Sequence, residues 1–125
     1  MTYKTEQENF WAGKFGDEYN DRNIGKKLTA SNLDFFSRSL RRTQSINNCF
    51  EFGANIGMNF EALSVLFPDI NLGAIEINEA AVEVLRNKFP KAEILNESII
   101  EFKPKKKWDL VLIKGVLIHI NPDLL

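Results

Sequence analysis

The chain has 125 residues, which is enough for one small domain with a hydrophobic core. Its composition, 44% hydrophobic and 26% charged, is that of a folded globular protein and argues against disorder. The net charge of −1 offers no positive surface to nucleic acid or an anionic membrane, and a single cysteine with a single histidine argues against a disulfide or a zinc site. The first ten residues carry no secretory signal and no apolar run could span a bilayer, so we expect a cytoplasmic protein.

Residues 1–28 are polar, but they hold too many aromatic side chains for a disordered tail. We therefore expect this segment to fold onto the rest of the domain. Its aromatic residues are Tyr3, Phe10, Trp11, Phe15 and Tyr19. After it, Ser31 and Asp34 form an N-terminal capping pattern followed by apolar residues at helical spacing, which predicts a helix over residues 32–45.

From residue 49 onward, short apolar runs alternate with stretches of helical periodicity. The predicted strands are 49–52, 71–76, 92–96 and 109–113, and the predicted helices are 58–67 and 79–89, the second capped by Asn78. The lysine-rich run 103–107 is interpreted as a solvated turn, with a phosphate-binding patch as the alternative. This alternation indicates a Rossmann-like α/β fold, a parallel sheet of strand order 3-2-1-4 with helices on both faces.

The sharpest local motif is EFGANIG, from Glu51 to Gly57, between the first strand and its helix. Gly53 permits a tight turn, a second glycine permits a ligand to approach the backbone, and the following helix presents free amides. Glu76 stands at the end of the second strand, where a carboxylate can accept hydrogen bonds from both ribose hydroxyls of a nucleoside cofactor. Together the two features predict a nucleoside-binding crevice.

A dinucleotide is a poor match for this crevice, because a G-x-G-x-x-G fingerprint would need glycine where Asn55 and Met58 stand. Two carboxylates, Glu51 and Glu76, would repel a pyrophosphate but suit a ligand with an amine and a sulfonium. The pattern E-x-G-x-x-x-G followed by an acid resembles the cofactor loop of Rossmann-like S-adenosylmethionine-dependent methyltransferases. The alternatives are NAD binding and a glycine turn with two incidental glutamates.

Three blocks of the chain carry a narrower resemblance. EQENFWAGKFGDEYNDRN (6–23), FEFGANIGMNFEAL (50–63) and WDLVLIKGVLIHINPDLL (108–125) resemble the methylase family associated with pseudaminic acid biosynthesis, bacterial methyltransferases linked to surface glycans. The resemblance implies methyl transfer from S-adenosylmethionine to a small-molecule acceptor, a sugar or sugar nucleotide. The alternative is a non-catalytic S-adenosylmethionine-binding fragment or subunit of such an enzyme.

The same resemblance implies how the cofactor would lie. Its methionine part would contact the glycine loop, and its ribose would contact Glu76. Its adenine would contact the residues after the second and third strands, and its sulfonium would contact the end of the fourth strand. The residues expected to bind the cofactor are Glu51, Gly53, Ala54, Asn55, Gly57, Glu76, Ile77, Ser98, Ile99, Lys114 and Gly115.

Residues 1–28 resemble an N-terminal lid, in which the aromatic side chains of Trp11, Phe15 and Tyr19 would exclude water from the cofactor. The alternative is a plain hydrophobic plug on the sheet. His119, the only histidine, follows the fourth strand and is the candidate base for a hydroxyl acceptor. Alternatively it packs against, or caps, a helix that begins at Asn121.

The residues Asn121, Pro122 and Asp123 form a helix-start signal near the last residue of the chain. Methyltransferases of this class continue with further strands, so we expect residues 1–125 to be an incomplete methyltransferase domain. Residues 29–125 would be its cofactor-binding half. Its apolar fourth strand would then lie open, which favours self-association.

Overall fold

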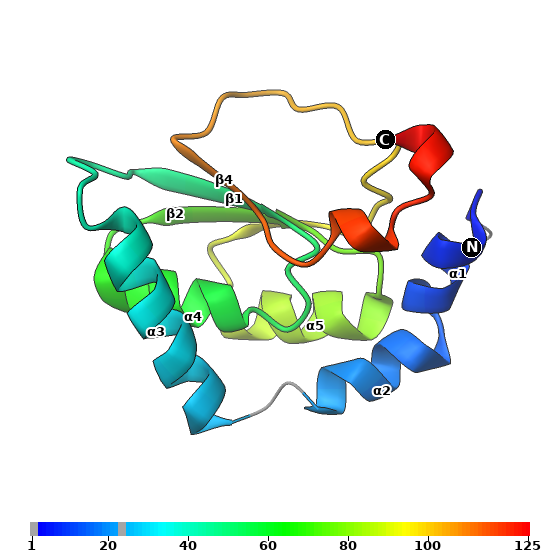
Figure 1. Cartoon of the computed structure of the whole chain (residues 1–125), viewed down its shortest axis with the longest axis horizontal. Helices are drawn as coiled ribbons and strands as arrows, with labels where there is room; N and C mark the ends of the chain where they lie inside the picture. The colour runs from blue at the N-terminus through cyan, green and yellow to red at the C-terminus, as the bar shows by residue number, and fades with distance from the viewer. Residues whose placement is uncertain (1–2, 23–24) are drawn as a thin grey trace.

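The computed structural model describes residues 3–22 and 25–125, which are built around one parallel sheet (Figure 1). Its strands are β1 (Asn48–Phe52), β2 (Asn71–Ile75), β3 (Glu93–Leu95) and β4 (Leu110–Ile113). They lie in the order β3-β2-β1-β4, and in the centre Phe50 of β1 pairs with Gly73 of β2 and Val111 of β4. The predicted Rossmann-like fold and strand order are confirmed.

Three α-helices cover one face of this sheet: α3 (Lys26–Leu40), α4 (Met58–Leu66) and α5 (Glu79–Lys88) (Figure 1). Successive strand residues point to opposite faces, so every second side chain meets these helices. The core between them contains Cys49, Leu72, Ala74, Leu110 and Leu112 from the strands with Phe60, Leu63, Val82 and Leu85 from the helices. Within the described ranges, no helix has the length and apolarity needed to cross a membrane.

The predicted helix 32–45 is shifted in the structure, where α3 spans Lys26–Leu40. Ser31 is therefore not its N-cap but an exposed residue inside the helix, because the residues before it contain nothing that breaks a helix. At the other end the amide and the hydroxyl of Thr43 both donate to the carbonyl of Leu40, which closes the last turn. Helix α3 then packs on α4.

Residues 3–22 form two short helices that the sequence analysis did not predict, α1 (Glu6–Ala12) and α2 (Lys14–Arg22). Helix α1 begins with a capping box: the Thr5 hydroxyl accepts from the Glu8 amide, and the Glu8 carboxylate accepts from the Thr5 amide. Helix α2 packs on α5, so the segment folds onto the domain as expected. Residues 1, 2, 23 and 24 of the expected lid segment lie outside the described residues.

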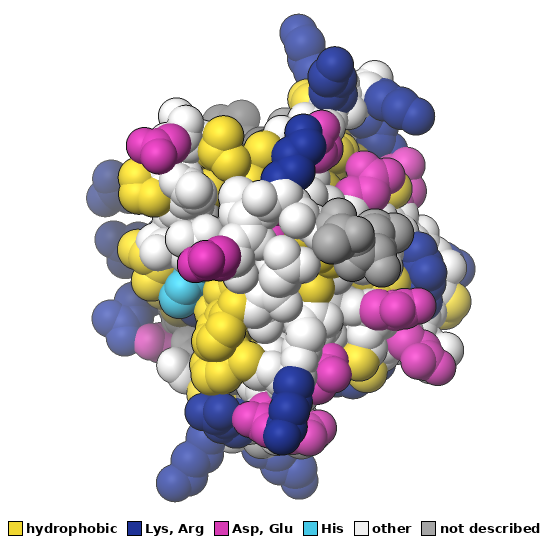
Figure 2. Space-filling model, turned by 90° about the vertical axis from the view of Figure 1, so that its right-hand side faces the viewer, with side chains coloured by type: hydrophobic (Ala, Val, Ile, Leu, Met, Phe, Trp, Pro, Cys, Tyr) yellow, Lys and Arg dark blue, Asp and Glu magenta, His cyan; other side chains and the backbone are white. Residues whose placement is uncertain are grey.

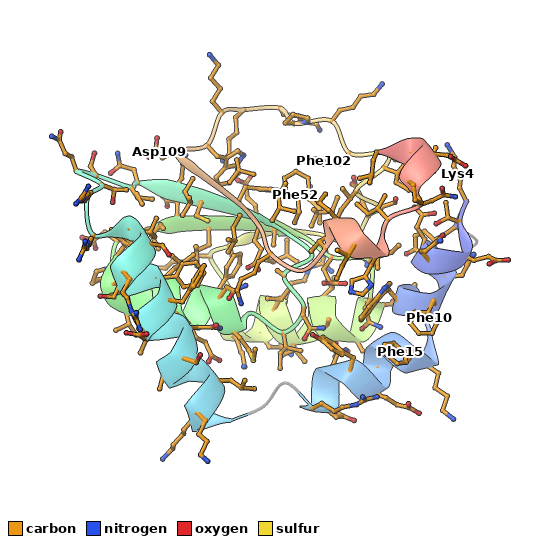
Figure 3. The ribbon with its side chains drawn as sticks, in the orientation of Figure 1. Lys4, Phe10, Phe15, Phe52, Phe102 and Asp109 are labelled. Carbon is orange, nitrogen blue, oxygen red and sulfur yellow. The ribbon has the colours of Figure 1, made fainter. Side chains whose placement is uncertain are left out.

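The second face of the sheet is covered by the segment 96–109 and not by an α-helix, which corrects the expectation of helices on both faces (Figure 1). Aromatic packing takes the place of the helix. Phe50 stacks on Phe102 with ring centroids 5.1 Å apart and also contacts Trp108. Figure 3 shows Phe52 and Phe102 turned toward one another there. The lysine-rich run 103–107 is an exposed loop on this face, as predicted.

Strand β4 leaves apolar side chains partly exposed on the same face. Val111 and Ile113 are 50% and 45% exposed, and among the described strands β4 pairs only with β1. An apolar edge strand is a template for pairing with another chain. We therefore expect the chain to self-associate, and the double substitution Val111→Thr and Ile113→Thr to shift it toward monomer. Light scattering after size-exclusion chromatography measures the mass; equal monomeric masses for both proteins would contradict this expectation.

Candidate functional site

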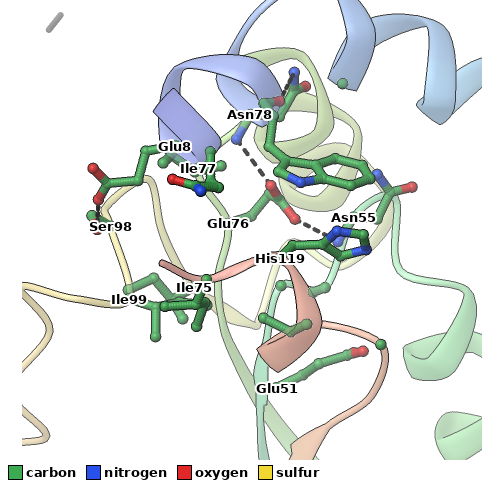
Figure 4. A pocket seen from close by; sticks show the side chains of 18 of the residues that line it. Glu8, Glu51, Asn55, Ile75, Glu76, Ile77, Asn78, Ser98, Ile99 and His119 are labelled. Atoms are coloured by element: carbon green, nitrogen blue, oxygen red, sulfur yellow. Dashed lines mark hydrogen bonds between the residues drawn. The ribbon is translucent and has the colours of Figure 1, made fainter. Parts of the chain in front are cut away.

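A cavity of about 230 Å³ lies at the carboxyl ends of β1, β2 and β4, the edge at which open parallel sheets bind ligands. Helices α1 and α2 contribute to its wall (Figure 4). The structure brings together there most of the predicted site residues: Glu51, Gly53, Ala54, Asn55, Glu76, Ile77, Ser98, Ile99, Lys114, Gly115, Trp11, Tyr19 and His119. Residues from five separate stretches of sequence therefore meet at one place.

Gly57 and Phe15, two of the residues predicted for the site, do not line this cavity. Gly57 is buried at the N-cap of α4 with φ 85°, and a Cβ there would come within 2.7 Å of Phe89. Its lack of a side chain thus serves the packing of α4 against α5. Phe15 instead stacks on Phe10 with ring centroids 4.2 Å apart, and both are labelled in Figure 3 at the side of the molecule away from the sheet.

Glu76 is held in place by two backbone amides. One carboxylate oxygen accepts from the Asn55 amide at 2.7 Å and the other from the Asn78 amide at 2.9 Å (Figure 4). Burial raises the pKa of this carboxyl, and the amide hydrogen bonds act in the opposite direction. Because a carboxylate oxygen has two acceptor positions, each oxygen retains one for a further donor.

The loop after β1 turns sharply at Gly53 and at Asn55, both of which have positive φ. Gly53 has φ 70°, and a Cβ there would lie 2.8 Å from a methyl group of Val116. Asn55 has φ 51°, a conformation that asparagine tolerates better than most residues. This asparagine replaces the middle glycine of a dinucleotide loop and turns its amide onto Glu76.

A network of side-chain amides ties the N-terminal helices to this loop. The Asn55 amide group donates to Asn20 of α2 at 2.5 Å, Asn20 donates to Asn78 at 2.9 Å, and Asn78 donates to Asp17 at 2.8 Å. Asn20 and Asn78 are buried. The sequence analysis missed Asn20, because its partners lie at least 35 residues away and no local pattern marks it.

Glu51 is a second acid of the cavity, and it is only 1% exposed. Asn59 donates to one of its oxygens at 2.5 Å, while the other oxygen has no partner among the described residues. Burial raises the pKa of Glu51 to about 8, with the nearby charge of Glu76 adding to the shift and Asn59 and Lys114 opposing it. The raised pKa favours the protonated form of Glu51 at neutral pH, in contrast to the two negative carboxylates expected in the crevice.

The raised pKa of Glu51 has a consequence for stability, because its ordinary value is 4.5. Between pH 4.5 and about 8 the unfolded chain releases a proton that the native chain retains. The stabilisation that protonated Glu51 contributes is full below pH 4.5 and is lost by about pH 8. Between these values the free energy of unfolding therefore falls by up to about 1.4 kcal/mol per pH unit. We expect Glu51→Gln to reduce this slope. A smaller slope of the same sign should remain, because the pKa of Glu76 is also raised.

Urea denaturation at about pH 5, 6.5 and 8 measures this slope. The control is Glu83→Gln, which changes an exposed acid on α5 and is expected to retain the wild-type slope. Identical slopes in wild type and Glu51→Gln would show that Glu51 is ionised in the native chain.

His119 lies at the mouth of the cavity, at the end of the short 3₁₀ turn Leu117–His119. Its side chain is exposed, and Figure 2 shows it, in cyan, among hydrophobic side chains at the surface. The ring packs against that of Trp11 with centroids 4.7 Å apart. The cap at Asn121 is made by its own side chain, which accepts from the Asp123 amide. His119 thus contacts the N-terminal segment and is not needed as a cap.

The described part of the chain has one free thiol and no cluster of metal-ligating side chains. No group of three or more His, Cys, Asp or Glu residues is placed there to hold a metal ion. Cys49 is buried in the core, and burial, with the nearby Glu51 adding to it, raises the pKa of its thiol to about 12. A thiol with that pKa is a packing residue and not a nucleophile at neutral pH.

Solved methyltransferases share this architecture. The plantazolicin methyltransferase BpumL, solved in complex with SAH (S-adenosylhomocysteine), superposes with a TM-score of 0.65 at 20% identity, over 86% of this chain and 44% of that one. The sugar N-methyltransferase KedS8 of a Streptoalloteichus species superposes with a TM-score of 0.64 at 16% identity, over 91% of this chain and 43% of that one. The fold is therefore that of class I S-adenosylmethionine-dependent methyltransferases.

A curated relative agrees with this fold. Malonyl-acyl-carrier-protein O-methyltransferase 2 of Ilyobacter polytropus is 25% identical over 96 residues, which are 74% of this chain and 36% of that protein. No model of a protein family matches the chain. The chain spans less than half the length of each of these three proteins.

Proposed function

We propose that this chain binds S-adenosylmethionine and belongs to an enzyme that transfers the methyl group to a small-molecule acceptor. The observation that carries the proposal is Glu76, fixed by two amides at the carboxyl end of β2 with an acceptor position left on each oxygen. Two ribose hydroxyls present the matching pair of donors. The adenine would then lie beside Ile77 and Ile99, and the ammonium of the methionine part near the unpartnered oxygen of Glu51.

The names of the similar proteins support this choice of cofactor and acceptor. BpumL was solved with SAH, KedS8 is a sugar N-methyltransferase, and the Ilyobacter relative is an O-methyltransferase. We propose a sugar or sugar nucleotide as the acceptor, within the chemistry of pseudaminic acid and other surface glycans. This finer assignment is supported by the resemblance in the blocks 6–23, 50–63 and 108–125, of which Asn23 lies outside the described residues.

The proposed reaction is an in-line displacement at the methyl carbon. A bond forms from the acceptor oxygen to the methyl carbon as the carbon–sulfur bond breaks, and SAH leaves as the neutral thioether. The chain's part is to align the donor and exclude water, for which Trp11 and Tyr19 line the cavity. A hydroxyl acceptor also loses a proton, and His119 at the cavity mouth is the group we propose to take it.

Ligand-induced stabilisation tests the proposal. At about 100 times its dissociation constant a ligand adds about 2.7 kcal/mol to the free energy of unfolding, which a thermal melt detects. We expect S-adenosylmethionine and SAH to raise the melting temperature and NAD to leave it unchanged. A response to NAD alone would overturn the proposal. Binding of SAH without methyl transfer to any sugar acceptor would favour the alternative, a non-catalytic S-adenosylmethionine-binding fragment or subunit of such an enzyme.

A further inference from the structure

The cavity contains a third acid, Glu8, which comes from α1 and which the proposed function does not use. Its side chain is buried, 8% exposed, and lies opposite Ser98 from the loop after β3, also 8% exposed. One carboxylate oxygen accepts from the Thr5 amide at 2.9 Å, and the other contacts the hydroxyl of Ser98 (Figure 4). Both residues line the cavity.

The hydrogen bonds around Glu8 keep its carboxyl ionised. Burial acts to raise the pKa of Glu8, but hydrogen bonds from the Ser98 hydroxyl and from the amides of Thr5 and Lys4 outweigh it and lower the pKa. An ionised carboxylate has only acceptor positions, and its remaining ones can take a donor from a ligand. The cavity thus presents a fixed acceptor at this wall.

The position of Glu8 matches one end of the proposed cofactor. In Figure 4, Ile77 lies between Glu8 and Glu76, the acid proposed to bind the ribose, whereas Ile99 lies on the side of Ser98 and Glu51 lies farther from Glu8. A base that packs on the two isoleucines with its ribose on Glu76 would direct its outer edge toward Glu8. In adenine that edge carries an exocyclic amine, which is a donor, whereas hypoxanthine carries a carbonyl oxygen at the same atom.

We propose that Glu8, oriented by Ser98, accepts a hydrogen bond from the exocyclic amine of the cofactor's adenine and so determines the base that the site takes. The inference rests on the proposed function. Because Glu8 is also the capping-box residue of α1, the start of that helix fixes the carboxylate in place. Base recognition would therefore come from the N-terminal segment and not from the sheet alone.

The test compares SAH with S-inosylhomocysteine, in which a carbonyl replaces the amine and the neighbouring ring nitrogen carries a hydrogen. Isothermal titration calorimetry gives both dissociation constants. We expect wild type to favour SAH by at least tenfold, because the carbonyl would leave a buried carboxylate facing an acceptor. In Glu8→Gln the amide can donate to the carbonyl, and we expect the preference to fall by at least tenfold.

Two further variants complete the experiment. Glu6→Gln changes an exposed acid on the same helix and is expected to keep the wild-type preference. Ser98→Ala frees the Glu8 carboxylate and is expected to reduce the preference, which provides a second readout if Glu8→Gln does not fold. If Glu8→Gln folds and keeps the wild-type preference, the assignment of Glu8 is overturned while the proposed function stands. If Glu8→Gln does not fold, an unchanged preference in Ser98→Ala has the same meaning. Absence of SAH binding by wild type overturns the proposed function and this inference with it.

Discussion

Glu76→Ala is expected to weaken SAH binding by roughly 10- to 150-fold, which corresponds to about 1.5–3 kcal/mol for hydrogen bonds to a charged group. The substitution removes the acceptors proposed for the ribose hydroxyls. It also removes the partner of the Asn55 and Asn78 amides, so the loop after β1 loses the contact that holds it at the cavity. Both effects act on the ligand-binding edge, while the core between the sheet and its helices is untouched.

Calorimetric titration with SAH measures this loss, and two other variants show its cause. Glu76→Gln keeps the shape of the side chain but replaces one acceptor oxygen by a donor, so we expect a loss nearly as large. Glu79→Ala removes an exposed acid three residues further on and should bind like wild type. If Glu76→Ala binds SAH with wild-type affinity, the carboxylate does not contact the ribose.

The strands and the helices after residue 48 could be predicted because their signals are local. The helices α4 and α5 begin at their predicted residues and each ends one residue earlier than predicted, and Asn78 caps α5 through its side chain as expected. Strand order followed from the general rules for parallel sheets. The capping box at Thr5 and Glu8 was an equally local signal for α1, which the sequence analysis overlooked in favour of the aromatic residues around it.

The lining of the cavity was predictable only in part, because spacing along the chain does not show which residues from other elements pack against a given side chain. The motif from Glu51 to Gly57 was placed correctly at the end of β1, but Gly57 faces α5 instead of the cavity. The charge of Glu51 depends on its burial, and the role of Asn20 depends on partners from other elements. Such properties are set by tertiary packing and have no counterpart in a local pattern.

His119→Asn is expected to lower the rate of methyl transfer to a hydroxyl acceptor by about 100-fold or more while changing SAH affinity by no more than about twofold. The imidazole lies at the cavity mouth against Trp11, where an acceptor can approach it from outside. Asparagine keeps a side chain of similar polarity but cannot take up a proton at neutral pH. The effect should therefore fall on turnover and not on cofactor binding.

Transfer of a labelled methyl group from S-adenosylmethionine to a panel of sugars and sugar nucleotides measures this rate. Ile118→Asn is the matched control, since Ile118 is adjacent, 83% exposed and outside the cavity lining, and its variant should retain wild-type turnover. An amine acceptor offers a second comparison, because an amine that is already neutral can attack before it loses a proton. If His119→Asn retains turnover on the hydroxyl acceptor that wild type uses, the histidine only packs against Trp11, and alignment of donor and acceptor carries the reaction.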